Sequence, residues 1–203
     1  DPTSLKDIYG SGALPINYPN VLDYKRGKTG GGIWLHGTPS AQFSRAPLST
    51  DGCVALANSD LDQVIRTVEV RSTPVVISQR LDWVTPHSAR ANSKPFEVAL
   101  TAWQNAKSSG NMDQILDFYS PDFNSNGKTL AQWTPDLRQE LDKVHGRTIQ
   151  LKDLSFLRWT DTADTMIVTF GEVAQGYRTG PIKRQYWGRH GTQWKIFYEG
   201  VIG

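Results

Sequence analysis

The spacing of apolar residues changes near residue 90, and this change constrains the fold of the 203-residue chain more than any other feature. Residues 9–40 are rich in glycine and proline, which indicates loops around short strands. After residue 95 apolar residues first recur with a helical period and later with a period of two, which is typical of strands. Residues 83–95 are polar and contain two prolines, so we expect a linker there, with a domain boundary near 88–94.

Short elements are expected in the first half. Ile33, Trp34 and Leu35 predict a buried strand that ends at His36. Residues 59–70 predict a helix with one apolar face, which begins at a cap formed by Asn58 or Ser59. Residues 73–78 are rich in β-branched side chains and predict a further strand.

The second half predicts three helices followed by strands. The first helix contains Phe96 and Trp103 and ends at Gly110, and Asn111 caps the second. The third covers residues 130–144. Strands are then expected at 165–170, 181–188 and 192–201, with a turn at His190 and Gly191. Helices followed by a strand meander favour an α+β fold.

Composition and charge exclude several classes of protein. The net charge is +2 and is spread evenly, so no basic stripe points to a nucleic-acid partner. No apolar run approaches the roughly 20 residues that a transmembrane helix needs. The chain begins without the pattern of a signal peptide. Its hydrophobic fraction of 38% is ordinary for a soluble globular protein.

Cys53 is the only cysteine, which rules out an internal disulfide. Such a thiol is either an inert buried group or a reactive one. His36 lies 17 positions upstream and could take the proton of the thiol. Gly52 allows a sharp turn before the sulfur, and the amides of such a turn can hold an oxyanion. Spacing alone leaves both interpretations of Cys53 open.

A longer motif surrounds these two residues. Positions 33–39 read IWLHGTP, an insert ends at Leu48, and positions 49–58 read STDGCVALAN. Over about residues 8–80 the chain resembles the L,D-transpeptidase catalytic domain, a mostly-β fold. The resemblance implies that Cys53 attacks a peptide carbonyl, that His36 is its base and that the Gly37 carbonyl orients the imidazole ring. It implies an oxyanion site at the amides of Gly52 and Cys53, and we expect neither a cofactor nor a metal.

The chain departs from this family in two ways. Many members have histidine directly before the Gly-Cys pair, where this chain has Asp51. A carboxylate there disfavours the thiolate unless Asp51 points away or pairs with Arg45. The family also has more strands before this point, so we expect the N-terminal part of the sheet to be incomplete in this chain.

Asp51 and three further residues are substrate-binding candidates. Arg45 could clamp a substrate carboxylate or be a solvated loop residue, and both interpretations stay open. Trp34 is more typical of a core residue than of a substrate platform. Thr50 could line the oxyanion site but needs no function as a turn residue. The other three histidines suit surface or capping roles. No two of these histidines have, together with Cys53, the spacing of metal ligands. They are His87, His145 and His190.

Residues 95–203 resemble the cone-shaped fold named for nuclear transport factor 2. The resemblance depends on the order of the elements and on the aromatic residues around Trp187 and Trp194. That fold surrounds a hydrophobic pocket and serves enzymes and binding modules alike. Six aromatic residues could line the pocket, but we expect them to form its packed core. They are Trp103, Tyr119, Trp133, Tyr177, Tyr186 and Trp194.

The sequence therefore predicts two domains, a partial L,D-transpeptidase-like domain over 1–90 and a pocket domain over 95–203. The resemblance implies a peptidoglycan stem peptide as substrate, cleaved at the L,D bond before D-alanine. Water as acceptor gives L,D-carboxypeptidase activity and an amine gives transpeptidase activity. Resemblance to a subgroup linked to cell shape favours trimming by water. Such a substrate implies export to the periplasm. The alternative is a non-catalytic cell-wall binding protein that uses the C-terminal pocket.

Overall fold

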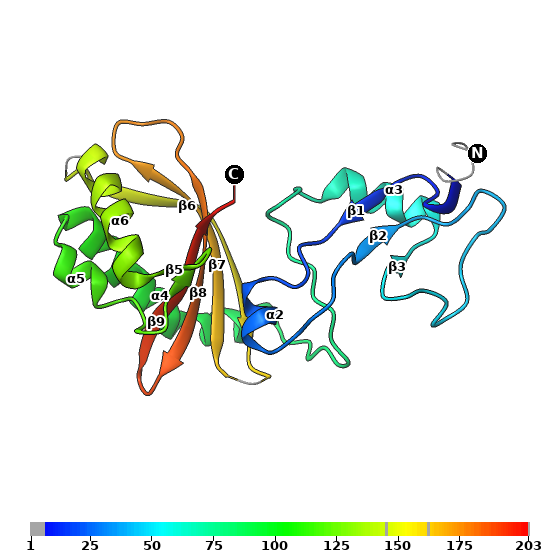
Figure 1. The fold of residues 1–203 in the computed structure, drawn as a ribbon, viewed down its shortest axis with the longest axis horizontal. Helices are drawn as coiled ribbons and strands as arrows, with labels where there is room; N and C mark the ends of the chain where they lie inside the picture. The colour runs from blue at the N-terminus through cyan, green and yellow to red at the C-terminus, as the bar shows by residue number, and fades with distance from the viewer. Residues whose placement is uncertain (1–6, 145, 162, 203) are drawn as a thin grey trace. The chain divides into compact units, whose positions relative to one another are not determined.

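The computed structural model describes residues 7–144, 146–161 and 163–202. The chain forms two compact units, which we call the front unit (Asp1–Ile77) and the rear unit (Ser78–Gly203). Figure 1 shows the front unit in blue to cyan and the rear unit in green to red. Among the described residues, no helix combines the length and the apolar character needed to cross a membrane.

The front unit contains a small sheet with the order β1-β2-β3. β1 (Ala13–Pro15) is antiparallel to β2 (Trp34–His36), which is parallel to β3 (Val54–Ala55). The strand expected to end at His36 is therefore present. The helix expected at 59–70 is α3 (Asn58–Thr67), whose Leu61 is fully buried.

Three expectations for the front unit were wrong. Residues 74–78 have no regular secondary structure, so the strand predicted at 73–78 is absent. Asn58 does not cap α3, because its side chain bonds elsewhere and Ala57 holds the cap position. α2 (Val21–Lys25) was missed within the expected loops, although Asn20 and Asp23 form a reciprocal capping box at its start.

The rear unit begins with helices. α4 (Pro86–Ser109) is longer than expected and includes residues 86–95, which were predicted to be a linker. Thr85 caps this helix through the amide of Ser88, and Pro86 occupies the first turn, where its missing N–H costs nothing. Gly110 then ends α4 in the left-handed conformation, as expected.

The remaining elements form a helical layer and a meander. α5 (Met112–Leu116) begins at the predicted cap Asn111, and α6 (Leu130–Val144) matches the third predicted helix. The short strands β4 (Asn124–Ser125) and β5 (Lys128–Thr129) form a hairpin. The main sheet has the order β6-β7-β8-β9, and its neighbours are all antiparallel. Its strands are β6 (Ile149–Trp159), β7 (Thr165–Ala174), β8 (Ile182–His190) and β9 (Gln193–Val201).

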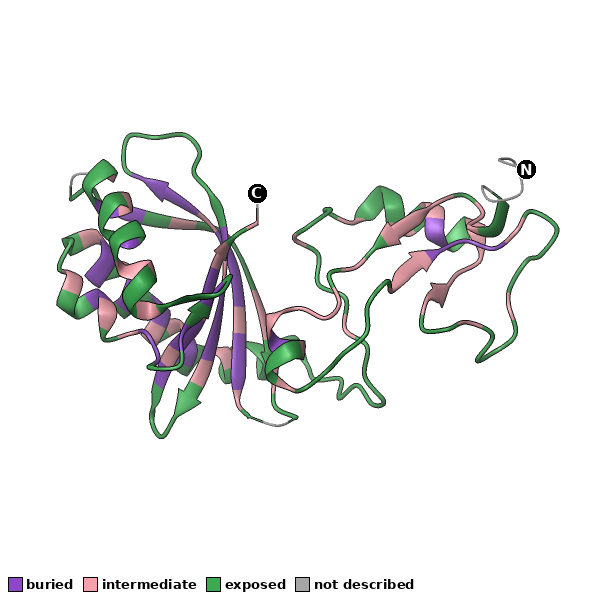
Figure 2. Cartoon of the chain, in the orientation of Figure 1, coloured by how far each residue is buried: buried purple, intermediate pink, exposed green. Residues whose placement is uncertain are grey.

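The hydrophobic core of the rear unit lies between the helices and one face of this curved sheet (Figures 1 and 2). Met166, Val168 and Phe170 alternate along β7 and all belong to this core, as their period of two predicted. β6 was missed, because its side chains are mostly exposed and show no clean alternation. The front unit has a much smaller core, and its buried hydrophobic side chains among the described residues are Leu22 and Leu61.

Candidate active site

His36 is buried at the end of β2 and has a defined orientation. Its Nδ1 atom lies 2.6 Å from the carbonyl oxygen of Gly37. A carbonyl oxygen only accepts hydrogen bonds, so Nδ1 must carry the proton. In the neutral ring this leaves the lone pair on Nε2, which is the form that a general base requires. The ring of Tyr9 packs edge-on against the imidazole, with 5.3 Å between centroids.

The pairing of β2 with β3 brings Cys53 near this histidine. Leu35 pairs with Val54 and His36 with Ala55, so the same register places Cys53 opposite Trp34. Residues two apart on a strand share a face, so His36 and Cys53 are on the same face. Neighbouring strands and a two-residue step put their Cα atoms roughly 8 Å apart, a separation that an imidazole and a thiol can span. The pairing of β2 with β3 therefore gives a backbone arrangement in which the predicted base can approach the predicted nucleophile.

Cys53 is half-buried, and its thiol donates a hydrogen bond to the Gly32 carbonyl over 3.7 Å. The turn before it is closed by the Thr50 hydroxyl, which donates to the Cys53 carbonyl over 2.7 Å. Gly52 has a φ of 114°, and a Cβ there would lie 2.8 Å from the Ile33 side chain. Position 52 therefore requires glycine, both for this backbone conformation and for the space beside Ile33. The amides of Gly52 and Cys53 lie in this turn beside the sulfur.

The other predicted substrate residues differ in their exposure and contacts. Trp34 is half-buried and packs against the Tyr9 ring, with 5.3 Å between centroids. Asp51 is exposed. Arg45 is half-buried, and its Nε atom is shielded from solvent without a hydrogen-bond partner in the described part of the chain. A shielded N–H group without an acceptor costs free energy unless a ligand or water accepts its hydrogen bond. Arg45 is therefore suited to bind an anionic group.

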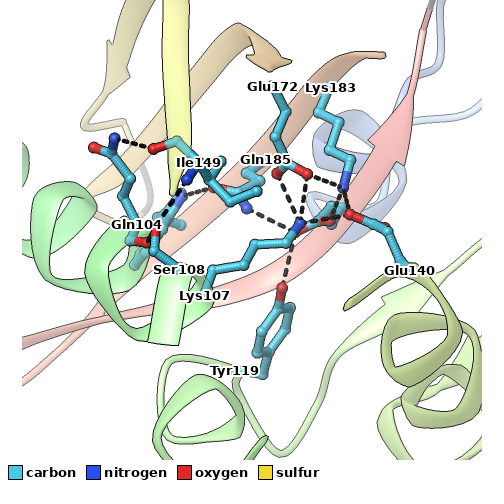
Figure 3. Close-up of polar contacts among 11 residues, drawn as sticks. Gln104, Lys107, Ser108, Tyr119, Glu140, Ile149, Glu172, Lys183 and Gln185 are labelled. Atoms are coloured by element: carbon cyan, nitrogen blue, oxygen red, sulfur yellow. Dashed lines mark hydrogen bonds and ion pairs between the residues drawn. The ribbon is translucent and has the colours of Figure 1, made fainter. Parts of the chain in front are cut away.

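The rear unit contains a buried ion cluster that sequence reasoning missed. The Lys107 ammonium contacts carboxylate oxygens of Glu140 and Glu172, both at 2.7 Å. The Lys183 ammonium lies 2.5 Å from the same Glu140 oxygen and 3.4 Å from Glu199. Figure 3 shows four of these side chains converging from α4, α6 and the sheet, namely Lys107, Glu140, Glu172 and Lys183. We call these five residues the ion cluster.

Neutral groups complete the hydrogen bonds of the ion cluster. The Tyr119 hydroxyl donates to Glu199 over 2.9 Å, and the Gln185 amide donates to the same oxygen over 2.6 Å. The Trp187 indole in turn donates to Gln185. Buried charges are tolerated only when they are paired and hydrogen-bonded in this way. The sequence held one signal of this cluster. Glu172 on β7, and Lys183 and Gln185 on β8, occupy every second position, on the same face as the buried apolar residues of their strands.

Comparison with known proteins identifies both units. Residues 96–200, more than half of the chain, match the family model of the Cds6 C-terminal NTF2-like domain. The chain belongs to this family. Residues 2–77 match the model of the L,D-transpeptidase catalytic domain. The chain therefore joins a region similar to the L,D-transpeptidase catalytic domain to an NTF2-like domain. No curated protein sequence matches it.

Two solved structures share the fold of both units. One is Bd1075 of Bdellovibrio bacteriovorus, with a TM-score of 0.74 and 22% identity over 96% of this chain and 72% of that chain. The other is the helical cell shape determining protein Pgp2 of Campylobacter jejuni. Its TM-score is 0.65, with 24% identity over 96% of this chain and 69% of that chain.

Most of the six aromatic pocket candidates belong to the packed interior of the NTF2-like domain. Trp103, Tyr119 and Trp194 lie in its hydrophobic core, and the half-buried Trp133 packs against it. Tyr186 is also buried, against Phe197 and Tyr198. The exception is Tyr177, which is exposed and lies beneath the Arg147 guanidinium. The expectation of a packed core rather than a pocket lining is therefore confirmed for the buried members.

Two of the other three histidines are exposed. His87 is exposed on α4, and His190 is exposed at the end of β8, next to the turn at Gly191. His145 lies outside the described residues. Within the described ranges, no three His, Cys, Asp or Glu side chains gather as metal ligands would.

The charges of the ion cluster shift several pKa values. Burial opposes ionisation of Glu140, but Lys107 and Lys183 outweigh this and lower the pKa of its carboxyl. Burial also opposes the charge of Lys183, yet Glu199, Glu172 and Glu140 outweigh it and raise the pKa of the ammonium. Burial and the neighbouring Glu199 carboxylate raise the pKa of Tyr119 well above its ordinary value. Burial raises the pKa of Glu172.

These directions predict that the NTF2-like domain loses stability at alkaline pH. Lys183 and Tyr119 keep their protons to higher pH when folded than when unfolded, where they titrate near 10.5 and 10.0. Their contribution is complete below those values and is lost as pH rises through the folded pKa values. Urea unfolding between about pH 8 and 11 should therefore show a free energy of unfolding that holds to about pH 10 and declines above it. Tyr119→Phe should reduce the slope, whereas replacement of the exposed Tyr177 by Phe should not.

Proposed function

We propose that the chain is a cysteine acyl-transfer enzyme that acts on peptidoglycan stem peptides at the L,D bond before D-alanine. Cys53 is the nucleophile, His36 is its base, and the Gly37 carbonyl orients the imidazole. The amides of Gly52 and Cys53 form the oxyanion site. Arg45 binds a substrate carboxylate, and Trp34, Thr50 and Asp51 line the approach. Thr50 acts there mainly by holding the turn.

One observation carries this proposal. The 2.6 Å contact between Nδ1 of His36 and the Gly37 carbonyl leaves Nε2 as the basic nitrogen, on the strand face that Cys53 shares. A sole cysteine in an apolar interior would be inert, but Cys53 is half-buried beside a turn built on Gly52. The match of residues 2–77 to the L,D-transpeptidase catalytic domain supports the same assignment.

The reaction follows from these positions. Nε2 of His36 takes the thiol proton, and the thiolate sulfur attacks the carbonyl carbon of the L,D bond. The carbonyl oxygen becomes an oxyanion held by the Gly52 and Cys53 amides. The C–N bond then breaks, His36 returns the proton to the leaving amine, and D-alanine departs from a thioester on Cys53. Attack on that thioester by water or an amine releases the product and frees the thiol.

We favour water as acceptor, which would make the enzyme an L,D-carboxypeptidase that trims stem peptides. Pgp2, with which the chain shares its fold, is a helical cell shape determining protein. Shortening a stem peptide removes a site for cross-linking, so trimming is one way to influence cell shape. Action on peptidoglycan places the enzyme in the periplasm.

The proposal is tested by covalent labelling of Cys53. A β-lactam of the penem kind should acylate the wild-type chain once, and intact-mass spectrometry should detect the adduct. Cys53→Ala should abolish the adduct, while the neighbouring Thr50→Ser should keep it because the hydroxyl that closes the turn remains. Incubation with purified tetrapeptide should then yield tripeptide rather than cross-linked dimer. A wild-type chain that forms neither an adduct nor tripeptide would instead favour a non-catalytic wall-binding role.

A further inference from the structure

Asn58 stands at the centre of the hydrogen bonds behind His36, although the motif gives it no chemical role. Its Oδ1 atom accepts from the amides of Ser11 (3.0 Å) and Thr38 (3.1 Å), and its Nδ2 donates to the Thr38 carbonyl over 2.9 Å. A Cβ on Gly37 would lie 2.1 Å from Oδ1. The absence of a side chain at Gly37 therefore allows Asn58 to approach the backbone this closely.

The peptide group between Gly37 and Thr38 connects Asn58 to the histidine. Its N–H donates to Asn58 Oδ1, and its C=O accepts from Nδ1 of His36. A trans peptide group is planar, so its N–H and C=O point in opposite directions. Holding the Thr38 N–H toward Asn58 therefore aims the Gly37 C=O at the imidazole. Thr38 is itself fully buried, which leaves this peptide little freedom to rotate.

We infer that Asn58 is a positioning residue that sets the tautomer of His36 by fixing the orientation of the Gly37–Thr38 peptide. If this peptide rotated, the carbonyl would no longer hold the proton on Nδ1, and the imidazole could place it on Nε2 instead. An Nε2–H imidazole cannot take the proton of the thiol. The relevance to catalysis rests on the proposed function, but the tautomer is a property of the folded chain alone.

The direct test is ¹⁵N NMR of the imidazole nitrogens in the full chain, with the His36 signals identified among the 4 histidines by His36→Gln. Wild-type His36 should be the Nδ1–H tautomer, and Asn58→Ala should convert a large fraction to Nε2–H. Penem acylation of Cys53 should slow on the order of tenfold, the size expected for one lost hydrogen bond. Asn58→Asp keeps an oxygen acceptor for the two amides and should retain the Nδ1–H tautomer.

Asn20 provides the matched control. Its side chain also accepts from two backbone amides of the front unit, those of Leu22 (2.9 Å) and Asp23 (3.1 Å). Asn20→Ala should therefore cost similar stability in a thermal melt while the His36 tautomer stays unchanged. An unaltered His36 tautomer in Asn58→Ala would overturn the inference. A tautomer change without any acylation in the wild type would support the inference and count against the proposed function.

Discussion

With glutamine in place of His36, acylation of Cys53 by a penem slows by a factor of about 10²–10⁴, the usual contribution of a positioned general base. Glutamine occupies a similar volume in the buried site, but its amide cannot take a proton from the thiol. The rate is measured by intact-mass spectrometry at several times after mixing. His36 is expected to have this effect because its Nδ1 proton is already committed to the Gly37 carbonyl.

The control for this variant is His87→Gln, which removes an exposed histidine of α4. It should acylate at the wild-type rate. If His36→Gln also acylated within about threefold of wild type, a contribution under 1 kcal/mol, His36 would not be the base. Thermal melts of both variants separate a loss of the base from a loss of the fold.

Lys183→Met is expected to destabilise the NTF2-like domain by about 3–5 kcal/mol, because it removes the cation that contacts Glu199 and leaves Lys107 to balance both Glu140 and Glu172. The Lys183 side chain is 2% exposed, and its ammonium contacts three carboxylates of the ion cluster. Methionine fills a similar volume but supplies neither charge nor donors. Urea unfolding followed by tryptophan fluorescence measures the change in the free energy of unfolding.

Two further variants test the reason for this loss. Lys128 pairs with Asp136 at the surface, where both side chains are 53% exposed, so Lys128→Met should cost no more than about 1 kcal/mol. Adding Glu140→Gln to Lys183→Met removes one of the negative charges that Lys107 alone must then balance, and should recover part of the stability. Equal losses for the two lysine variants would mean that the ion cluster is no more important than a surface pair.

Local patterns predicted much of the architecture. Gly110 was predicted to end α4 and Asn111 to cap α5, and both predictions were confirmed. Such caps could be predicted because a cap bonds only to residues a few positions away in the sequence. Met166, Val168 and Phe170 alternate because one face of β7 meets the core, so the period of two was reliable. The helix over 86–95 was mistaken for a linker, since its polar, proline-containing sequence has no apolar face. Its start depends on the Thr85 cap rather than on burial.

The sequence by itself determined the candidates for chemistry, because Cys53 is the sole thiol and its motif names His36 as the base. It also determined that three helices precede β7, β8 and β9 in the NTF2-like domain, although β6 was missed. Only the tertiary structure decided which proton His36 carries and that Asn58 holds the Gly37–Thr38 peptide in place. It alone assembled the ion cluster from residues up to 92 positions apart, Lys107 and Glu199. Short-range periodicity reports which face is buried, but a hydrogen bond between distant segments exists only once packing brings its two atoms together.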